Sequence, residues 1–172
     1  MSPINADPPA MAPLFEGAPR FLARLAAAGP FADDVTLFSA ARSIAHAMPQ
    51  AEQLELIDAH PRLGAPPDSV SAASFVEQGY DRADASPAAP AEDAAGDAAA
   101  LAAELARRND AYEARFGFRY CVFVAGRPRE ALLPGMAAAL DADRDAEIHR
   151  AIDAVVDIAI DRHAKLSAED PR

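Results

Sequence analysis

The sequence predicts an all-α protein: a compact single-domain bundle of about seven to nine helices, with one extended segment near Phe118–Ala125. Two observations carry this prediction. Apolar residues recur at spacings of three and four along most of the chain, as they do on the buried face of an amphipathic helix. Only FRYCVFVAG, which starts at Phe118, has the composition of a strand. No second convincing strand is present to pair with it, so it is either an isolated extended segment or part of a helix.

Stop signals separate the first three predicted helices. Gly29-Pro30 ends a helix that carries an apolar face in residues 15–28. Asp33 or Asp34 is a suitable N-cap for the next helix, which Pro49 ends. The third helix ends at His60, because the proline that follows disfavours helical dihedrals at the residue before it. Further helical patterns cover residues 74–83, 98–117, 128–142 and 145–166.

We expect one helical domain over residues 14–166, with a flexible arm over 1–13 and a C-terminal tail over 167–172. The N-terminus lacks the basic start and apolar stretch of a signal peptide. Residues 83–97 consist almost entirely of Ala, Pro, Asp and Gly, so we expect a surface loop there.

Composition narrows the classes of function. The chain has 172 residues and a net charge of −11, which disfavours nucleic acids and anionic membranes as partners. A chain of this length can bury about 70% of its unfolded surface without a disulfide or a metal. Its single cysteine, Cys121, cannot form an internal disulfide, which fits a reducing cytoplasmic location.

Four histidines are candidates for chemistry, and His60 differs from the others because it stands between a helix end and a Pro-rich loop. It is either a functional group that faces a pocket or a cap on the helix end. No pair of histidines has the i, i+4 spacing of a zinc helix, and no glycine-rich phosphate loop occurs, so we expect no metal and no cofactor. Taken alone, Ser74-x-x-Glu77 fits a capping box, which closes a helix N-terminus, better than it fits a functional site.

Three stretches are more specific together than any of them alone: HPRLG from His60, SFVEQG from Ser74 and NDAYEARFGF from Asn109. In this order they resemble the 2-oxo-4-hydroxy-4-carboxy-5-ureidoimidazoline (OHCU) decarboxylase family of urate degradation. The resemblance runs from about Leu14 to Leu166. It implies an all-helical, cofactor-free carboxy-lyase that acts on a small anionic ureide, yields (S)-allantoin and usually forms a homodimer.

The resemblance also implies the site residues. His60 would donate a proton, Glu77 would orient the substrate or the imidazole, and Arg162, which matches less securely, would neutralise the substrate carboxylate. The family commonly has proline at the position of Arg119, so this residue adds a charge near the pocket. The implied substrate contacts are Pro61, Ser74, Phe75, Val76, Gln78, Phe118, Arg119, Tyr120, Cys121 and Val122, with backbone groups serving over Phe118–Val122.

The implied chemistry explains why a histidine is needed. Loss of carbon dioxide leaves an electron pair that a neighbouring ring C=N bond can accept, and protonation must then occur on one face. An imidazole with an ordinary pKa near 6.5 suits that donation. Two alternatives stay open: a non-catalytic helical binding domain, and a lyase or hydrolase of a related ureide. A concave site that joins His60, Glu77 and Phe118–Val122 would favour the enzyme.

Overall fold

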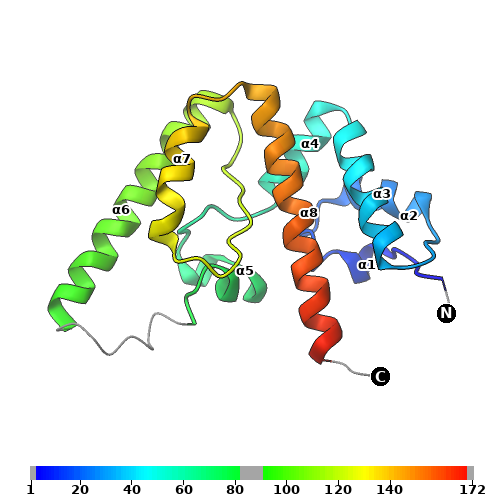
Figure 1. The fold of residues 1–172 in the computed structure, drawn as a ribbon, viewed down its shortest axis with the longest axis horizontal. Helices are drawn as coiled ribbons and strands as arrows, with labels where there is room; N and C mark the ends of the chain where they lie inside the picture. The colour runs from blue at the N-terminus through cyan, green and yellow to red at the C-terminus, as the bar shows by residue number, and fades with distance from the viewer. Residues whose placement is uncertain (1–2, 82–90, 170–172) are drawn as a thin grey trace. The chain divides into compact units, whose positions relative to one another are not determined.

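The computed structural model describes residues 3–81 and 91–169, and its regular elements in this part of the chain are helices (Figure 1). Eight α-helices occur there, together with short 3-10 helices. Within the described residues, strand-type pairing is confined to one isolated bridge between Ile4 and Phe31. The predicted all-α class is therefore confirmed.

Contacts divide the chain into two compact units. The first unit contains the residues up to His60 and those from Asp145 onward, and the second contains Pro61–Arg144. The boundary along the chain falls between His60 and Pro61, directly after the third helix that the sequence predicts.

The first unit is built around α2, which packs against its neighbours α1, α3 and α4. The long α8 contributes a buried apolar stripe with the predicted spacing, including Ile148, Ile152 and Val155. Asp33 caps α3 as expected: its Oδ1 accepts from the Thr36 amide at 2.8 Å. The helices are α1 (Pro8–Met11), α2 (Pro19–Ala28), α3 (Asp34–Ala47), α4 (Gln50–Asp58) and α8 (Arg144–Glu169).

Both chain ends differ from the expectation. The segment expected to be a flexible arm over 1–13 is instead docked in its described part, because the Ile4 and Phe31 backbones exchange hydrogen bonds of 2.7 and 2.9 Å and Ala6 is buried. At the other end, α8 continues through residues 167–169, which were expected to be part of a tail.

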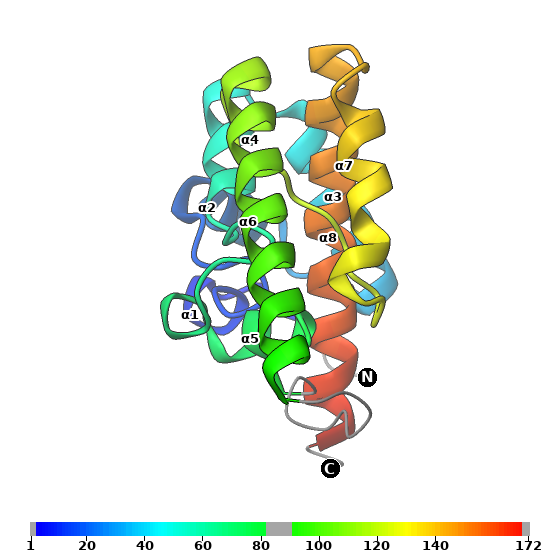
Figure 2. The ribbon, with the colours of Figure 1, turned by 90° about the vertical axis from the view of Figure 1, so that its left-hand side faces the viewer.

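The second unit contains η1 (Pro67–Ser69), α5 (Ala72–Glu77), α6 (Ala91–Phe116), η3 (Arg129–Leu132) and α7 (Leu133–Ala139). Helices α6 and α7 contact each other and run together along much of α7 (Figure 2). The expected loop over 83–97 is wrong for residues 91–97, which begin α6; residues 82–90 lie outside the described residues. Alanine is the strongest helix former, so an Ala-rich stretch can start a helix.

The predicted extended segment is present. Residues 118–124 belong to no helix and run as an irregular trace in Figure 1. Their aromatic side chains anchor them around the buried Tyr112, whose ring centroid lies 5.5 Å from that of Phe118 and 5.1 Å from that of Tyr120. Aromatic packing therefore holds this segment in place of a sheet.

Gly64 of the HPRLG stretch packs its backbone directly onto α6. Its φ is +79°, and a Cβ at this position would lie 2.8 Å from Cδ1 of Leu105. We predict that Gly64→Ala lowers the free energy of unfolding by about 1 kcal/mol or more, because both strain and a clash are introduced. The melting temperature should fall by roughly 2–4 °C or more.

Gly96→Ala is the matched control. Gly96 lies in α6 with open space where a Cβ would project, so the variant should become slightly more stable, by about 0.5–1 kcal/mol. Equal melting temperatures for wild type and Gly64→Ala would contradict the packing described here.

Candidate active site

His60 follows the end of α4 and is 4% exposed. Its Nδ1 donates to the Leu56 carbonyl at 3.3 Å, so the ring does cap the last turn of α4. A carbonyl only accepts hydrogen bonds, so Nδ1 carries the proton and the neutral ring has its lone pair on Nε2. The cap and the functional interpretation are therefore compatible, since the cap fixes the tautomer.

Arg162 of α8 is also 4% exposed and is held by the segment between α1 and α2. Its Nη2 pairs with Oε1 of Glu16 at 2.9 Å, and its Nη1 donates to the Pro13 carbonyl at 2.9 Å. A buried guanidinium needs such partners, because an uncompensated charge away from water is costly. The carboxylate and the carbonyl fix both the position and the orientation of the cation.

The pKa of His60 is lowered from 6.5 to about 4. Burial is the largest cause and the nearby charge of Arg162 the second, whereas Glu16 and the hydrogen bond to Leu56 act in the opposite direction. His60 is therefore neutral at pH 7 in the unliganded protein. This corrects the expectation of an imidazole with an ordinary pKa, and the physical reason is that the ring is buried beside a cation.

The 61–65 loop, defined as Pro61–Ala65, is held by side chains from the other two motif stretches. Gln78 accepts from the Gly64 amide at 2.7 Å and donates to the Arg62 carbonyl at 3.1 Å. Asn109 donates to the Leu63 carbonyl at 2.9 Å. Beyond these stretches, the Tyr80 hydroxyl donates to the Ala65 carbonyl. The three stretches thus meet around one loop.

The side chain of Arg62 fastens the same loop to α6. Its Nε and Nη2 donate to the two carboxylate oxygens of Glu113 at 2.7 and 2.5 Å, and its Nη1 also pairs with Asp110 at 3.0 Å. Bidentate pairing of this kind is geometrically specific. The second and third motif stretches therefore fix both the backbone and the side chain of the loop.

The capping-box interpretation of Ser74 and Glu77 is wrong, because α5 begins earlier. Its N-cap is Ser71, whose Oγ accepts from the Ser74 amide at 3.1 Å. Ser74 and Gln78 are buried and Glu77 is half-buried, all toward one face of α5. Val76 lies on the opposite face and is 48% exposed.

Phe75 packs on Tyr80 with ring centroids 5.4 Å apart. Over the extended segment, Phe118, Tyr120 and Cys121 are buried, whereas Arg119 and Val122 are half-buried. The rings of Phe118 and Tyr120 both pack around Tyr112.

A recess of about 360 Å³ in the second unit brings Pro61 and Arg119 together. The 61–65 loop forms much of its wall, and Asn109 contributes from α6. Arg119 gives this recess a cationic side chain.

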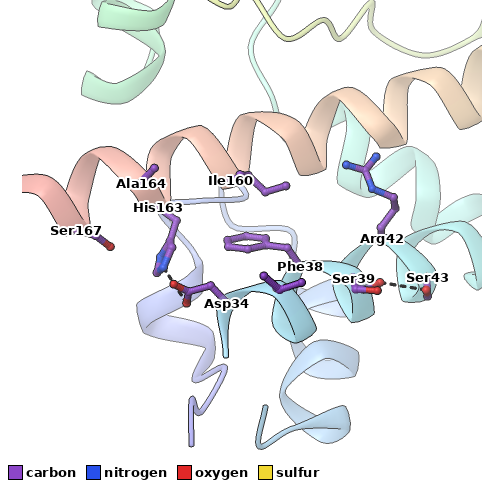
Figure 3. Close-up of a pocket in the computed structure, with 10 residues that line it drawn as sticks. Asp34, Phe38, Ser39, Arg42, Ser43, Ile160, His163, Ala164 and Ser167 are labelled. Atoms are coloured by element: carbon purple, nitrogen blue, oxygen red, sulfur yellow. Dashed lines mark hydrogen bonds and ion pairs between the residues drawn. The ribbon is translucent and has the colours of Figure 1, made fainter. Parts of the chain in front are cut away.

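A second recess, of about 630 Å³, lies between α3 and α8 and contains none of the expected site residues (Figure 3). Phe38 and Ile160 line it with apolar surface, and its His163 pairs with Asp34 at 3.0 Å. Arg42 pairs outside the recess with Asp153. His163 and Arg42 are thus engaged by neighbouring carboxylates.

The described residues contain no group of three or more His, Cys, Asp or Glu side chains placed to hold a metal ion. Over the same part of the chain, every helix falls short of the length and apolarity that a membrane crossing requires.

The expected residues are thus divided between the two units, and of those in the second unit the recess brings together Pro61 and Arg119. His60 and Arg162 belong to the first unit, and the remaining expected residues belong to the second. Sequence reasoning missed Glu16, although the stretch LFEGAPRFLARL was part of the resemblance. Its one sequence signal is an acidic residue before Gly17 in a connection between helices.

Comparison with known proteins identifies the family of this chain. The family model described as OHCU decarboxylase matches residues 8–164. The chain belongs to the OHCU decarboxylase family. Comparison with proteins of curated function gives no match.

Solved structures of the OHCU decarboxylase fold agree. A crystal structure of OHCU decarboxylase in the presence of (S)-allantoin matches with a TM-score of 0.68 and 23% identity, covering 92% of this chain and 97% of the other. A crystal structure of (S)-allantoin synthase matches with a TM-score of 0.54 and 18% identity. This chain is covered to 90% and spans 47% of that protein. At these identities the two structures show the shared fold.

The lowered pKa of His60 makes the stability of this family member depend on pH. The unfolded chain binds a proton at His60 below pH 6.5, whereas the folded protein binds it only below about pH 4. The free energy of unfolding should therefore fall as the pH drops from 6.5 to 4, by up to about 3 kcal/mol from this group. Denaturant unfolding at several pH values measures the slope.

His60→Gln should have a shallower slope over this pH range, whatever its stability at pH 7. His149→Gln, which changes an exposed histidine, serves as control and should keep the wild-type slope. Identical slopes for wild type and His60→Gln would exclude a buried neutral imidazole.

Proposed function

We propose that this protein decarboxylates OHCU to (S)-allantoin. In this proposal His60 donates the proton, and Arg162 and Glu77 are the main charged residues that bind the substrate. The observation that carries the proposal is a buried imidazole of fixed tautomer in the same unit as a buried, oriented guanidinium, in a chain whose residues 8–164 match the OHCU decarboxylase family.

The reaction needs charge control and one well-placed proton. The carboxylate leaves as carbon dioxide, and its electron pair moves through the adjacent C=N bond to the ring nitrogen, which takes up a proton. The hydroxyl then loses its proton as a carbonyl forms, and the carbon that bears the ureido group gains one. The substrate anion thus consumes one proton overall, and the face on which carbon is protonated sets the configuration.

A neutral His60 can carry out these proton transfers in two steps. Its Nε2 lone pair first accepts the hydroxyl proton as the carbonyl forms, and the resulting imidazolium then donates to the neighbouring carbon. The Leu56 carbonyl, which accepts from Nδ1, keeps the ring oriented in both steps. The negative charge of bound substrate raises the pKa of His60, so the protonated state becomes accessible within the complex.

Arg162 supplies the positive charge for an anionic substrate. Its guanidinium is oriented before binding by Glu16 and the Pro13 carbonyl, so little freedom is lost when a carboxylate approaches. Arg119, which lines the recess beside the 61–65 loop, is a second cation available to the same class of substrate.

In the second unit, the carboxylate of Glu77 would accept from the ureido or hydroxyl group of the substrate. The backbone of Phe118–Val122 would pair with ring amides, and Ser74 and Pro61 would contact the substrate directly. We assign Gln78 to the loop, because both ends of its amide already bind loop backbone. We leave Val76 out because it lies on the exposed face of α5.

We also propose, on the family resemblance and the composition, that the protein acts as a homodimer in the cytoplasm. The mass of the full chain measured by light scattering during size-exclusion chromatography distinguishes one copy from two.

His60→Asn should abolish enzyme-dependent formation of (S)-allantoin while the protein stays folded, because no other group would deliver the proton to one face. The substrate is generated in the cuvette with urate oxidase and hydroxyisourate hydrolase, and circular dichroism follows the chirality of the product. His149→Asn, at an exposed histidine, should retain wild-type activity. Full activity of His60→Asn would remove His60 from the mechanism.

Glu77→Gln should lower turnover by about tenfold or more, because the charged acceptor for the substrate is lost. Ser71→Ala is the control: it removes the N-cap bond of α5 and should reduce stability by about 1 kcal/mol with little effect on turnover. An unchanged rate in Glu77→Gln would show that the carboxylate does not act on the substrate.

A further inference from the structure

The connection between α1 and α2 adopts an uncommon backbone conformation at Glu16. This non-glycine residue has a φ of +52°, and Gly17 follows with a φ of +100°. Positive φ is sterically unfavourable for residues with a Cβ and persists where surrounding contacts demand it. The contact that accounts for this conformation is the ion pair of Glu16 with Arg162, because the positive φ brings the Glu16 carboxylate to the guanidinium.

The contacts of this connection converge on one cation. The Glu16 carboxylate lies 2.9 Å from Nη2 of Arg162, the Pro13 carbonyl accepts from Nη1 at 2.9 Å, and the Leu14 carbonyl lies 3.5 Å from Nη1. The Glu16 side chain is 15% exposed and that of Arg162 is 4% exposed. An ion pair so far removed from water interacts strongly and is little screened by salt.

Both partners of this pair also act on His60. The charge of Arg162 lowers the pKa of the imidazole, and the charge of Glu16 raises it, with the effect of Arg162 the larger of the two. Glu16 therefore reduces the penalty that Arg162 places on a protonated His60.

We propose that Glu16 is a positioning residue for the decarboxylation: it fixes the guanidinium of Arg162 and offsets part of its charge beside His60. The inference rests on the proposed function, in which Arg162 binds the substrate carboxylate and His60 carries the proton. Glu16 acts through these two residues.

The offset matters for the chemical step. The substrate carboxylate loses its localised charge as carbon dioxide departs, so a cation that is too strong stabilises the ground state more than the transition state. The same cation opposes the imidazolium that must form at His60. When Arg162 is paired with Glu16, it still binds the anion, but it stabilises the ground state less and opposes the imidazolium less.

Glu16→Gln tests this, with Glu52→Gln as the matched control, because Glu52 forms an ion pair with Arg24 at 2.7 Å elsewhere in the first unit. We expect kcat to fall by about tenfold or more in Glu16→Gln, with KM unchanged or lower. In the unliganded protein, NMR titration should show a pKa of His60 below that of wild type. Glu52→Gln should match wild type in both measurements.

A purely structural role would reduce stability and active fraction while leaving the titration of His60 where it is, and that result would overturn the inference. If Glu16→Gln does not fold, the double variant Glu16→Gln/Arg162→Gln removes both charges together. Its His60 should have a pKa above that of wild type, because the larger effect of Arg162 is lost; no rise would overturn the inference.

The titration needs no substrate, so it separates this inference from the proposed function. Failure of wild-type protein to make (S)-allantoin would defeat the proposed function, whereas an unchanged His60 titration in Glu16→Gln would defeat the role of Glu16 alone.

Discussion

The clamp on the 61–65 loop is the constraint on which the candidate site depends. A loop that leaves a helix exposes backbone groups that must find partners when they are removed from water. Here the Gln78 amide serves both a backbone donor, at Gly64, and a backbone acceptor, at Arg62. Only a side chain with one donor and one acceptor can do both, so Glu cannot replace Gln at this position. The clamped loop in turn forms much of the wall of the recess that Arg119 lines.

The fold could be predicted where local chemistry decides it. Pro61 ends the helix before His60, and Asp33 caps α3 with a side chain three residues from its partner. Prediction failed where distant contacts decide. The N-terminal segment docks because Ile4 pairs with Phe31, and its Pro-rich composition carries no sign of that. The Ala-rich start of α6 fits both a helix and a low-complexity loop, so composition alone could not choose.

The site shows the same division. The HPRLG stretch identified His60, but the charge state of His60 depends on burial and on Arg162, which reaches it from the far end of the sequence. Ser74-x-x-Glu77 has the spacing of a capping box, yet Ser71 takes the cap because α5 starts three residues earlier. Glu16 could not be found from spacing, because its role depends on a positive φ and on a contact with α8.

The charges around His60 suggest how its neighbouring side chains would contribute to the proposed reaction. At neutral pH the group of His60, Arg162 and Glu16 has no net charge: the imidazole is neutral and the two ions are paired. In the proposed reaction, the arriving carboxylate makes the buried group negative, and the one proton that the substrate takes up at its ring nitrogen as carbon dioxide departs restores neutrality. His60 then moves the hydroxyl proton to carbon, and two neutral products are released. The buried group thus returns to its starting charge. The negative charge of the bound substrate is present only until carbon dioxide leaves, so the site binds the anion without holding the neutral products.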